Sequence, residues 1–342
     1  MATASQAGDP SAQAVLEDTL SECILRGADA EIRAALLDAP SHAVYRHLWE
    51  SVCATAEPAA DAGGTLRTRL FALSLILVTG ATRPVIISAI VPDIAALTAL
   101  LEQHGAIGAT RNFGLSNALC PLEALEGLEP SAVYRWNADW AAVAAPREIP
   151  PRETMVEPGR EQVHLRFLAG AAIMSPDAPS FLEAAATIDA WGMPFARALA
   201  RQLAQAGLDL LPLPRPPISL LHAAHAGRYA QLELASNLFV SNTVRQFRAT
   251  VGDPTVLISA HRMEAGAAEI RISMSSVFDD TLLEGFRWPL HPLDDLERIV
   301  ATIGELLHDC RVTDVRAVET VLPGRLASGA LFLGAGCHGV FQ

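Results

Sequence analysis

Thr255–Met263 (TVLISAHRM) and Glu269–Val277 (EIRISMSSV) are two runs rich in β-branched and other apolar residues, and the five residues Glu264–Ala268 separate them. Such runs are typical of strands, and the short interval between them predicts a hairpin. A helical pattern from Asp294 and a further strand pattern at Val312–Leu322 follow. This order predicts an α/β or α+β fold in which helices flank a mixed sheet.

The alternation along the hairpin assigns its side chains to two faces. Side chains along a strand change face at every residue, and directly opposed residues share a face. A five-residue turn sets Ile258 opposite Met274 on an apolar face and His261 opposite Arg271 on a polar face. The candidate binding residues of the polar face are Ser259, His261, Arg271 and Ser273. Two interpretations stay open: a half-solvated antiparallel hairpin, or a polar ligand- or partner-binding site on the sheet.

Two arginines precede the hairpin on a predicted helix, Leu232–Val251. Arg245 and Arg248 are three residues apart and therefore share a helix face. Guanidinium groups bind carboxylates through paired hydrogen bonds. We therefore expect Arg245, Arg248 and Arg271 to anchor an acidic peptide or protein partner in a groove beside the hairpin.

The composition predicts an ordered protein with a substantial core, because 51% of the 342 residues are hydrophobic and 18% are charged. The length allows two domains or one large α/β domain. The predicted segments are a flexible N-terminus at 1–13, a helical segment at 14–65, a small α/β unit at 66–145, a proline-rich connection at 146–160, a strand plus helices at 161–211, a second proline-rich connection at 212–218, and an α/β unit at 219–342.

Several local signals position elements within these segments. Leu70–Val78 is an unbroken apolar run, typical of a strand buried on both faces or of a buried helix. Ser41 and Asp93 are candidate N-caps of helices. Ala109–Leu119 (ATRNFGLSNAL) is the most polar interruption and is predicted as a connection whose side chains can bind a ligand.

The charge pattern excludes several classes of function. The formal net charge is −13, which argues against nucleic-acid binding because phosphate contacts need a basic face. All 25 basic residues are arginine. The absence of lysine excludes internal Schiff-base chemistry, a lysine-anchored pyridoxal phosphate, and the lysine of Walker A or kinase-type nucleotide sites. No cofactor is assigned from the sequence.

The cysteines and the N-terminus bear on the compartment. Five cysteines, an odd number with distant spacings, argue against a disulfide framework and favour a reducing cytoplasm. The N-terminal residues show neither a basic nor an apolar signal region, and no apolar run approaches the ~20 residues of a membrane span. We therefore expect a soluble cytoplasmic protein without a membrane partner.

Weak metal-binding signals occur in two places. His222 and His225 are three residues apart on a predicted helix and share a face. With a distant carboxylate they can form a facial metal site, and the adjacent acids Asp279 and Asp280 are candidate ligands. Structural histidines and a solvated turn explain the same residues without a metal.

A glycine motif at the C-terminus does not define a nucleotide site. Residues Gly334–Gly339 satisfy the pattern GxGxxG, but only three residues follow them. A dinucleotide site needs a helix after the glycines to hold the pyrophosphate.

Two classes of function remain open. The first is an accessory or adaptor protein that binds a peptide or protein partner, with self-association possible; the absence of strong catalytic motifs favours it. The second is an enzyme whose site combines a histidine with a carboxylate, with or without a metal. The sequence does not resemble any family that we can name.

Overall fold

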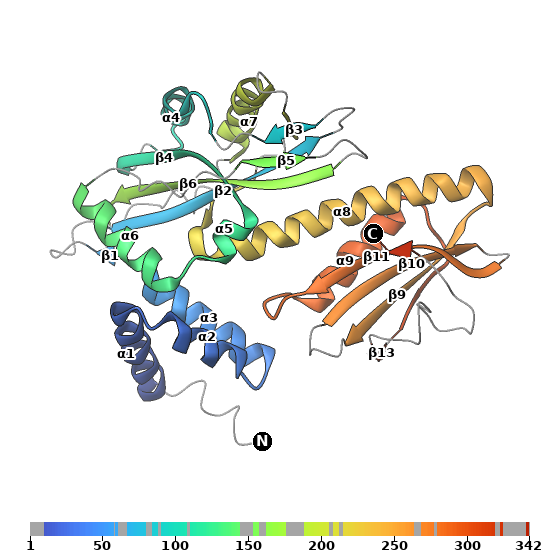
Figure 1. Ribbon diagram of the computed structural model, residues 1–342, viewed down its shortest axis with the longest axis horizontal. Coiled ribbons are helices and arrows are strands. Elements are labelled where there is room, and N and C mark those ends of the chain that lie inside the picture. The colour runs from blue at the N-terminus through green and yellow to red at the C-terminus, as the bar shows by residue number, and fades with distance from the viewer. Residues whose placement is uncertain are drawn as a thin grey trace. The chain divides into compact units, whose positions relative to one another are not determined.

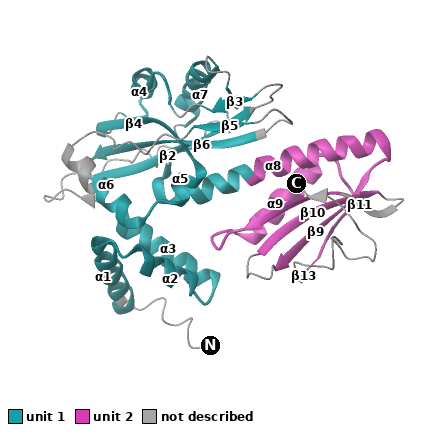
Figure 2. Ribbon diagram, viewed as in Figure 1, with its two compact units in different colours: residues 1–231 teal, residues 232–342 magenta. Residues whose placement is uncertain are grey.

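The structure is a computed structural model, a mixed α/β protein with an N-terminal helical segment (Figure 1). The chain divides into two compact units, residues 1–231 and 232–342 (Figure 2). The structure describes residues 10–57, 59–60, 67–79, 84–87, 90–107, 110–143, 153–156, 162–175, 188–204, 208–211, 215–262, 268–276, 279–318, 322–323 and 340–341. Among the helices in these ranges, none combines the length and the apolar character of a membrane span.

A central antiparallel sheet organises the first unit. Its order is β1 (Ala59–Ala60), β2 (Arg67–Thr79), β6 (Gln162–Met174) and β4 (Thr110–Pro121), and β7 (Asp209–Leu211) and β8 (Ile218–Ser219) also pair with β2. The apolar run Leu70–Val78 lies within β2, which decides between the buried strand and the buried helix that the sequence left open. Residues on both faces of this strand are buried: Phe71, Ala72 and Leu77 have no exposed surface.

One face of this sheet carries the main apolar core. Odd-numbered leucines of β2 pack there with α4 (Ile94–Gln103), α7 (Ile188–Ala204) and the two-stranded ribbon of β3 (Val85–Ile87) and β5 (Thr154–Val156). Asp93 caps α4, because its side chain accepts a hydrogen bond from the backbone nitrogen of Ala96. The predicted N-cap at Asp93 is therefore confirmed.

The other face packs against the start of α8 (Leu220–Thr250), and Figure 1 shows this first part of the helix, residues 220–231, on the side of the sheet opposite α4 and α7. Gly227 makes the close approach possible: a Cβ atom placed there would lie 2.2 Å from Cζ of Phe167, on β6. The helix and the strand therefore touch through glycine backbone at this point.

Three helices precede the sheet, α1 (Pro10–Arg26), α2 (Asp29–Leu37) and α3 (His42–Ala56). Ser41 caps α3 as predicted, since its hydroxyl accepts from the backbone nitrogen of Val44. Two further helices, α5 (Leu122–Glu126) and α6 (Pro130–Val143), follow β4. Asn137 of α6 donates from Nδ2 to the carbonyl of Ala56 at 3.1 Å, and this bond holds the end of α3.

The region around Ala109–Leu119 differs from the prediction of a connection. Ala109 lies outside the described residues, and Thr110–Leu119 forms most of β4, with irregular pairing to β6 between Thr110 and Asn112 and between Leu115 and Leu119. Ser116 lies in the second irregularity, and its hydroxyl accepts from the backbone nitrogen of Ala118 at 3.1 Å. The polar residues that suggested a loop lie where the strand pairing is interrupted.

The second unit contains the predicted hairpin. Its sheet has the order β12 (Val315–Ala317), β9 (Pro254–Arg262), β10 (Ala268–Ser276), β11 (Asp279–Leu290) and β14 (Val340–Phe341), and β13 (Leu322–Pro323) also pairs with β9. The helix α9 (Leu296–Asp309) connects β11 to β12, capped by Asp295. The strands β9–β11 and the strands β2, β4 and β6 thus belong to different sheets.

The predicted faces of the hairpin are right, but its predicted register is shifted by two residues. Ile258 lies opposite Ile272 instead of Met274, and His261 lies opposite Glu269 instead of Arg271. The last paired residues are Arg262 and Ala268, so each strand is paired one residue earlier in the chain than predicted. A shift of two preserves the faces because the side-chain period of a strand is two.

Candidate metal centre

The end of α3 presents two potential metal ligands on one side of the helix. Cys53 and Glu57 are four residues apart, and the backbone nitrogen of Glu57 donates to the carbonyl of Cys53 at 3.0 Å. Both side chains are turned into the unit, because Cys53 is 2% exposed and Glu57 is 8% exposed. Burial of the Glu57 carboxylate is costly unless it is hydrogen-bonded or paired with a positive charge, so the partners of these two side chains matter.

The start of α8 brings an imidazole to the same place. Strand β8 pairs Ile218 with Ala72 and Ser219 with Phe71, which fixes the chain just before α8 begins. His222 lies in the first turn of the helix. Its Nδ1 atom is 2.8 Å from Oγ of Ser219, and its ring meets the indole of Trp49 edge to face at 6.4 Å between centroids.

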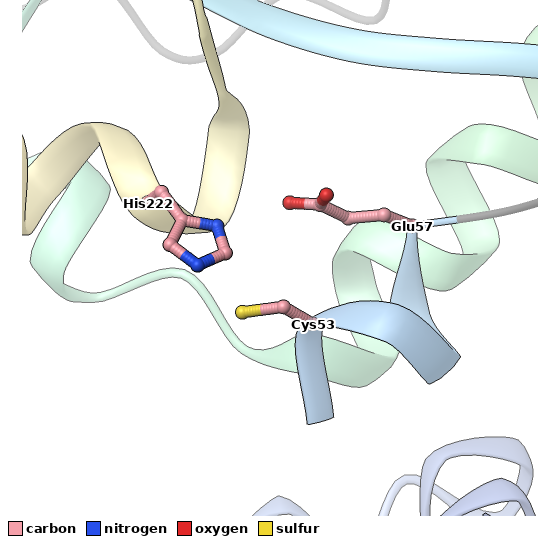
Figure 3. A group of neighbouring side chains, drawn as sticks. All are labelled: Cys53, Glu57 and His222. Atoms are coloured by element: carbon pink, nitrogen blue, oxygen red, sulfur yellow. The ribbon is translucent and has the colours of Figure 1, made fainter. Parts of the chain in front are cut away.

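These three side chains point toward one another (Figure 3). One ligand atom from each of Cys53, Glu57 and His222 lies within 4.8 Å of the other two. The group is the only set of three or more such ligands among the residues that the structure describes. Thiolate, carboxylate and imidazole are the three ligand types that zinc accepts in proteins.

Glu57 also has a structural role at the beginning of α8. Its Oε1 atom accepts from the backbone nitrogen of Leu221 at 3.4 Å, one of the nitrogens that a helix leaves without an intrahelical partner. Burial raises the pKa of the Glu57 carboxyl, and hydrogen bonds from Ser219 and Leu221 and the positive charge of Arg69 oppose that rise. The carboxylate can thus serve as a helix cap with or without a metal.

Cys53 is a poor nucleophile in this environment. Burial, followed by the negative charges of Glu57 and Glu50, raises the pKa of its thiol well above the ordinary range. The residue also lies in the last turn of α3, where the helix dipole disfavours an anion. Activated cysteines occur in the opposite environment, at helix N-termini or beside cations. A metal ion can supply the positive charge that a thiolate needs here.

His222 is suited to bind a metal through its second nitrogen. Burial, together with the neighbouring His225 imidazole, lowers the pKa of His222, so the neutral form is favoured near neutral pH. Because Nδ1 is bonded to Ser219, Nε2 is the nitrogen available to a metal. A neutral imidazole, oriented by a hydrogen bond to its other nitrogen, is the usual state of a histidine ligand.

Sequence reasoning named His222 as a metal candidate, and the structure places it with Cys53 and Glu57. His225 lies one turn further along α8. Asp279 and Asp280 begin β11 in the other unit, and their side chains fall outside the described residues. Sequence reasoning missed Cys53 and Glu57; their spacing of four on a predicted helix is the signal that could have identified them.

The polar face of the hairpin is buried. His261 has no exposed surface, and Ser259, Arg271 and Ser273 are each at most 3% exposed. Oγ of Ser259 lies 2.9 Å from Nε2 of His261, and Nε of Arg271 lies 2.5 Å from Oε1 of Glu269. These contacts form two buried polar pairs, whereas the buried Oγ atom of Ser273 has no hydrogen-bond partner among the described residues.

Arg245 and Arg248 do not share a sheet face with Arg271. Their helix covers the apolar face, because Phe239 of α8 packs against Phe286, which lies opposite Ile272. The exposed Arg245 donates to Oδ1 of Asn242. Arg248 donates to the carbonyls of Cys310 and Arg311, each at 2.9 Å, and to Asp253 at 2.6 Å, so its guanidinium holds the end of α9.

Comparisons with protein-family models, with curated proteins and with solved structures found no match to this chain.

Proposed function

We propose that this protein binds a zinc ion through Cys53, Glu57 and His222. The observation that carries the proposal is the convergence of three different zinc-type ligand atoms within 4.8 Å of one another, two on the buried Cys53 and Glu57 and one on the half-buried His222. Zinc-to-ligand distances of about 2.0–2.3 Å place tetrahedral ligand atoms roughly 3.3–3.8 Å apart. A closure of about 1 Å by side-chain rotation therefore completes the arrangement.

The ligand set favours zinc over the other common divalent cations. Magnesium and calcium prefer sites made of oxygen alone, whereas a thiolate and an imidazole suit zinc. Binding releases the thiol proton of Cys53 to solvent, and the resulting thiolate and the Glu57 carboxylate neutralise the two positive charges of the ion.

The proposed ion has a structural role. Cys53 and Glu57 lie at the C-terminal end of α3, and His222 lies in the first turn of α8. The metal therefore links the N-terminal helical segment to the helix that packs on the central sheet. A metal bound only by the folded state contributes its binding free energy to folding.

Metal analysis and stability measurements test this function. We expect wild-type protein, reduced and purified without a histidine tag, to bind one zinc ion per chain. We also expect free zinc at 100 times Kd to raise the free energy of unfolding by about 2.7 kcal/mol over the value in chelator. Cys53→Ser and His222→Gln lose both effects, whereas the control Cys120→Ser, at another buried cysteine, retains them. Wild-type protein that binds no zinc at micromolar concentrations contradicts the proposal.

A second function, partner binding by an accessory protein, is favoured by a separate observation. The ribbon of β3 and β5 presents Ile86 directly opposite Met155, and these side chains are 55% and 66% exposed. Ile90, four residues after Ile86 in the chain, is 49% exposed. A pair of exposed apolar side chains directly across a ribbon, such as Ile86 and Met155, favours an interaction surface.

Quantitative affinity purification tests this second function. A protein that copurifies with the wild type is expected to be lost with Met155→Ser and kept with Leu37→Ser, which removes an exposed leucine on α2. Equal recovery with both variants excludes the ribbon as the binding surface.

A further inference from the structure

A guanidinium group lies within the apolar side of the central sheet. Arg166 of β6 is opposite Leu75 of β2, so its side chain belongs to the face that carries the main core. The residue is 5% exposed. Arginine is rarely buried to this degree unless an acid is paired with it, because an uncompensated buried charge is costly. The partners of Arg166 therefore decide whether its burial is explained.

The partners that the structure gives to Arg166 are neutral oxygens. Nη1 donates to the carbonyl of Leu165 at 2.8 Å, and Nη2 donates to Oγ1 of Thr154, on β5, at 2.7 Å. The Nε atom is buried and has no hydrogen-bond partner. Within the described part of the chain, Arg166 makes no ion pair. Both the Nε donor and the positive charge are thus left without compensation.

Glu123 acts on this charge only from the surface. It lies two residues after Pro121, which is opposite Arg166, and it is exposed. Burial lowers the pKa of the Arg166 guanidinium, and the negative charge of Glu123 opposes that change. An exposed carboxylate that is not in contact with the guanidinium compensates its charge weakly, because water screens the interaction.

We propose that Arg166 binds a small aliphatic carboxylate beneath the β3–β5 ribbon, which Figure 1 shows on the same side of the sheet as α7. The two oxygens of a carboxylate can accept from Nε and Nη2 together, and its single negative charge balances the guanidinium. The Thr154 hydroxyl, which accepts from Nη2, keeps its own proton to donate to the ligand. A water molecule satisfies Nε but leaves the charge, and a phosphate dianion adds a second, unbalanced charge.

The surroundings favour an aliphatic chain on the ligand. Thr154 is opposite Ile87 in the ribbon, and Ile87 has no exposed surface. Ile87, Leu75 and Val156 belong to one buried apolar cluster. Methylene groups gain free energy when they leave water for such surroundings, whereas a second polar group loses it. We therefore expect the site to select monocarboxylates with a short apolar chain.

The ribbon covers the guanidinium, so it must move for a ligand to enter. Strands β3 and β5 pair with each other over three residues and, within the described residues, with no other named strand. An isolated two-stranded ribbon has little stability of its own. The ribbon can therefore lift without any break in the central sheet, and the bond between Thr154 and Arg166 closes it again.

This site is separate from the candidate metal centre. Gly227 of α8 faces the side chains of Leu165 and Phe167, the chain neighbours of Arg166. Because successive side chains of a strand point to opposite faces, Arg166 lies on the other side of the sheet from the start of α8. The inference goes beyond the proposed zinc binding and does not depend on it.

Thermal unfolding in chelator, at constant ionic strength, tests the proposal with sodium acetate, sodium butyrate and sodium phosphate as the added anions. We expect butyrate to raise the unfolding temperature of the wild type and to bind about 15-fold more tightly than acetate, from two further methylenes. Arg166→Met is expected to lose the response to butyrate. Arg201→Met, which removes an exposed arginine of α7, is the matched control and retains the response.

The ligand-free variants test whether the charge of Arg166 is truly unpaired. Removing an unpaired buried charge costs no ion pair, so Arg166→Met without ligand is expected to unfold at no lower a temperature than the wild type. Glu123→Gln is likewise expected to leave the unfolding temperature unchanged. A large decrease in both variants shows that Glu123 closes on Arg166 as its counter-ion, and this result overturns the proposal.

Proton NMR of the wild type gives a test that needs no stable Arg166 variant. His164 lies two residues before Arg166 on β6 and shares its face. Butyrate is therefore expected to shift the ring resonances of His164 and to leave those of the exposed His42 in place. Unchanged His164 resonances at saturating butyrate overturn the proposal, as does an equal thermal response of the wild type to butyrate and to phosphate.

Discussion

The Oε1 atom of Glu57, at the end of α3, lies 3.4 Å from the backbone nitrogen of Leu221, in the first turn of α8. One carboxylate thus closes the helical segment and caps the helix that packs on the central sheet. The two residues are 164 positions apart in the chain, so the contact is a long-range constraint on the fold.

Replacing Glu57 separates this structural contact from metal binding. Glu57→Ala removes the carboxylate that accepts from Leu221, and we expect a loss of about 0.5–2 kcal/mol from the free energy of unfolding in chelator. Glu57→Gln keeps an acceptor oxygen and is expected to lose less. Urea denaturation measures both, with Glu50→Gln as an exposed control on the same helix. Equal stability of Glu57→Ala and wild type contradicts the capping role.

Two helical glycines form a matched pair with opposite expected effects. At Gly227 an added Cβ meets Cζ of Phe167 at 2.2 Å, whereas at Gly304 of α9 it meets nothing within 4 Å. Alanine is the better helix former, so Gly304→Ala is expected to stabilise the protein by about 0.5–1 kcal/mol.

Gly227→Ala brings the same gain in helix propensity but forces α8 away from β6. We therefore expect a net loss of about 1–3 kcal/mol from the free energy of unfolding. Thermal or urea unfolding of both variants, compared with wild type, gives the two values. A stabilised Gly227→Ala protein shows that the helix and the strand are not in close contact.

The second sheet shows what local pattern can predict. Alternation placed Ile258 and His261 on opposite faces, and the structure confirms this. The register was not predicted correctly because registers that differ by two residues place every side chain on the same face. Only the length of the turn between the two strands distinguishes such registers. Caps such as Asp93 were predictable because a cap depends on residues within one turn.

The candidate metal centre shows what local pattern cannot predict. The spacing of His222 and His225 indicated a shared helix face. The partners of His222, however, come from α3, which is far from α8 in the sequence. The apolar pattern of a helix predicts which of its faces is buried but does not identify the element that packs against that face. The burial of His261 and Arg271 was equally hidden, since alternation assigns a face and does not say what covers it.

Arg248 was predicted to bind a partner, but its observed contacts are within its own chain. The sequence suggested an anchor for an acidic partner, and the structure shows its guanidinium bonded to the carbonyls of Cys310 and Arg311. Because its side chain is 39% exposed, we expect Arg248→Ala to lose only about 1 kcal/mol of unfolding free energy.

The exposed Arg245 serves as the control for that measurement. Arg245→Ala is expected to stay within about 0.5 kcal/mol of wild type, as is usual for surface substitutions. Urea denaturation of both variants is sufficient. Equal losses from the two substitutions would show that the contacts of Arg248 with the end of α9 contribute no stability of their own.

The acid sensitivity of the first unit should depend on His164, on β6. Burial, with the nearby Arg166 guanidinium, lowers the pKa of His164 below its ordinary value of 6.5. The folded state therefore binds fewer protons at this site than the unfolded state. Its stabilising contribution is present above pH 6.5 and is lost as the pH falls through the lower, folded-state pKa.

His164→Gln removes that proton-linked contribution, and we expect a shallower loss of unfolding free energy between about pH 7 and pH 5 than in wild type. Urea denaturation in chelator at several pH values measures the slope without interference from metal binding. His42→Gln, at an exposed histidine at the start of α3, is the control and should leave the slope unchanged. If His164→Gln and wild type lose stability in parallel, protonation of His164 does not drive the acid sensitivity.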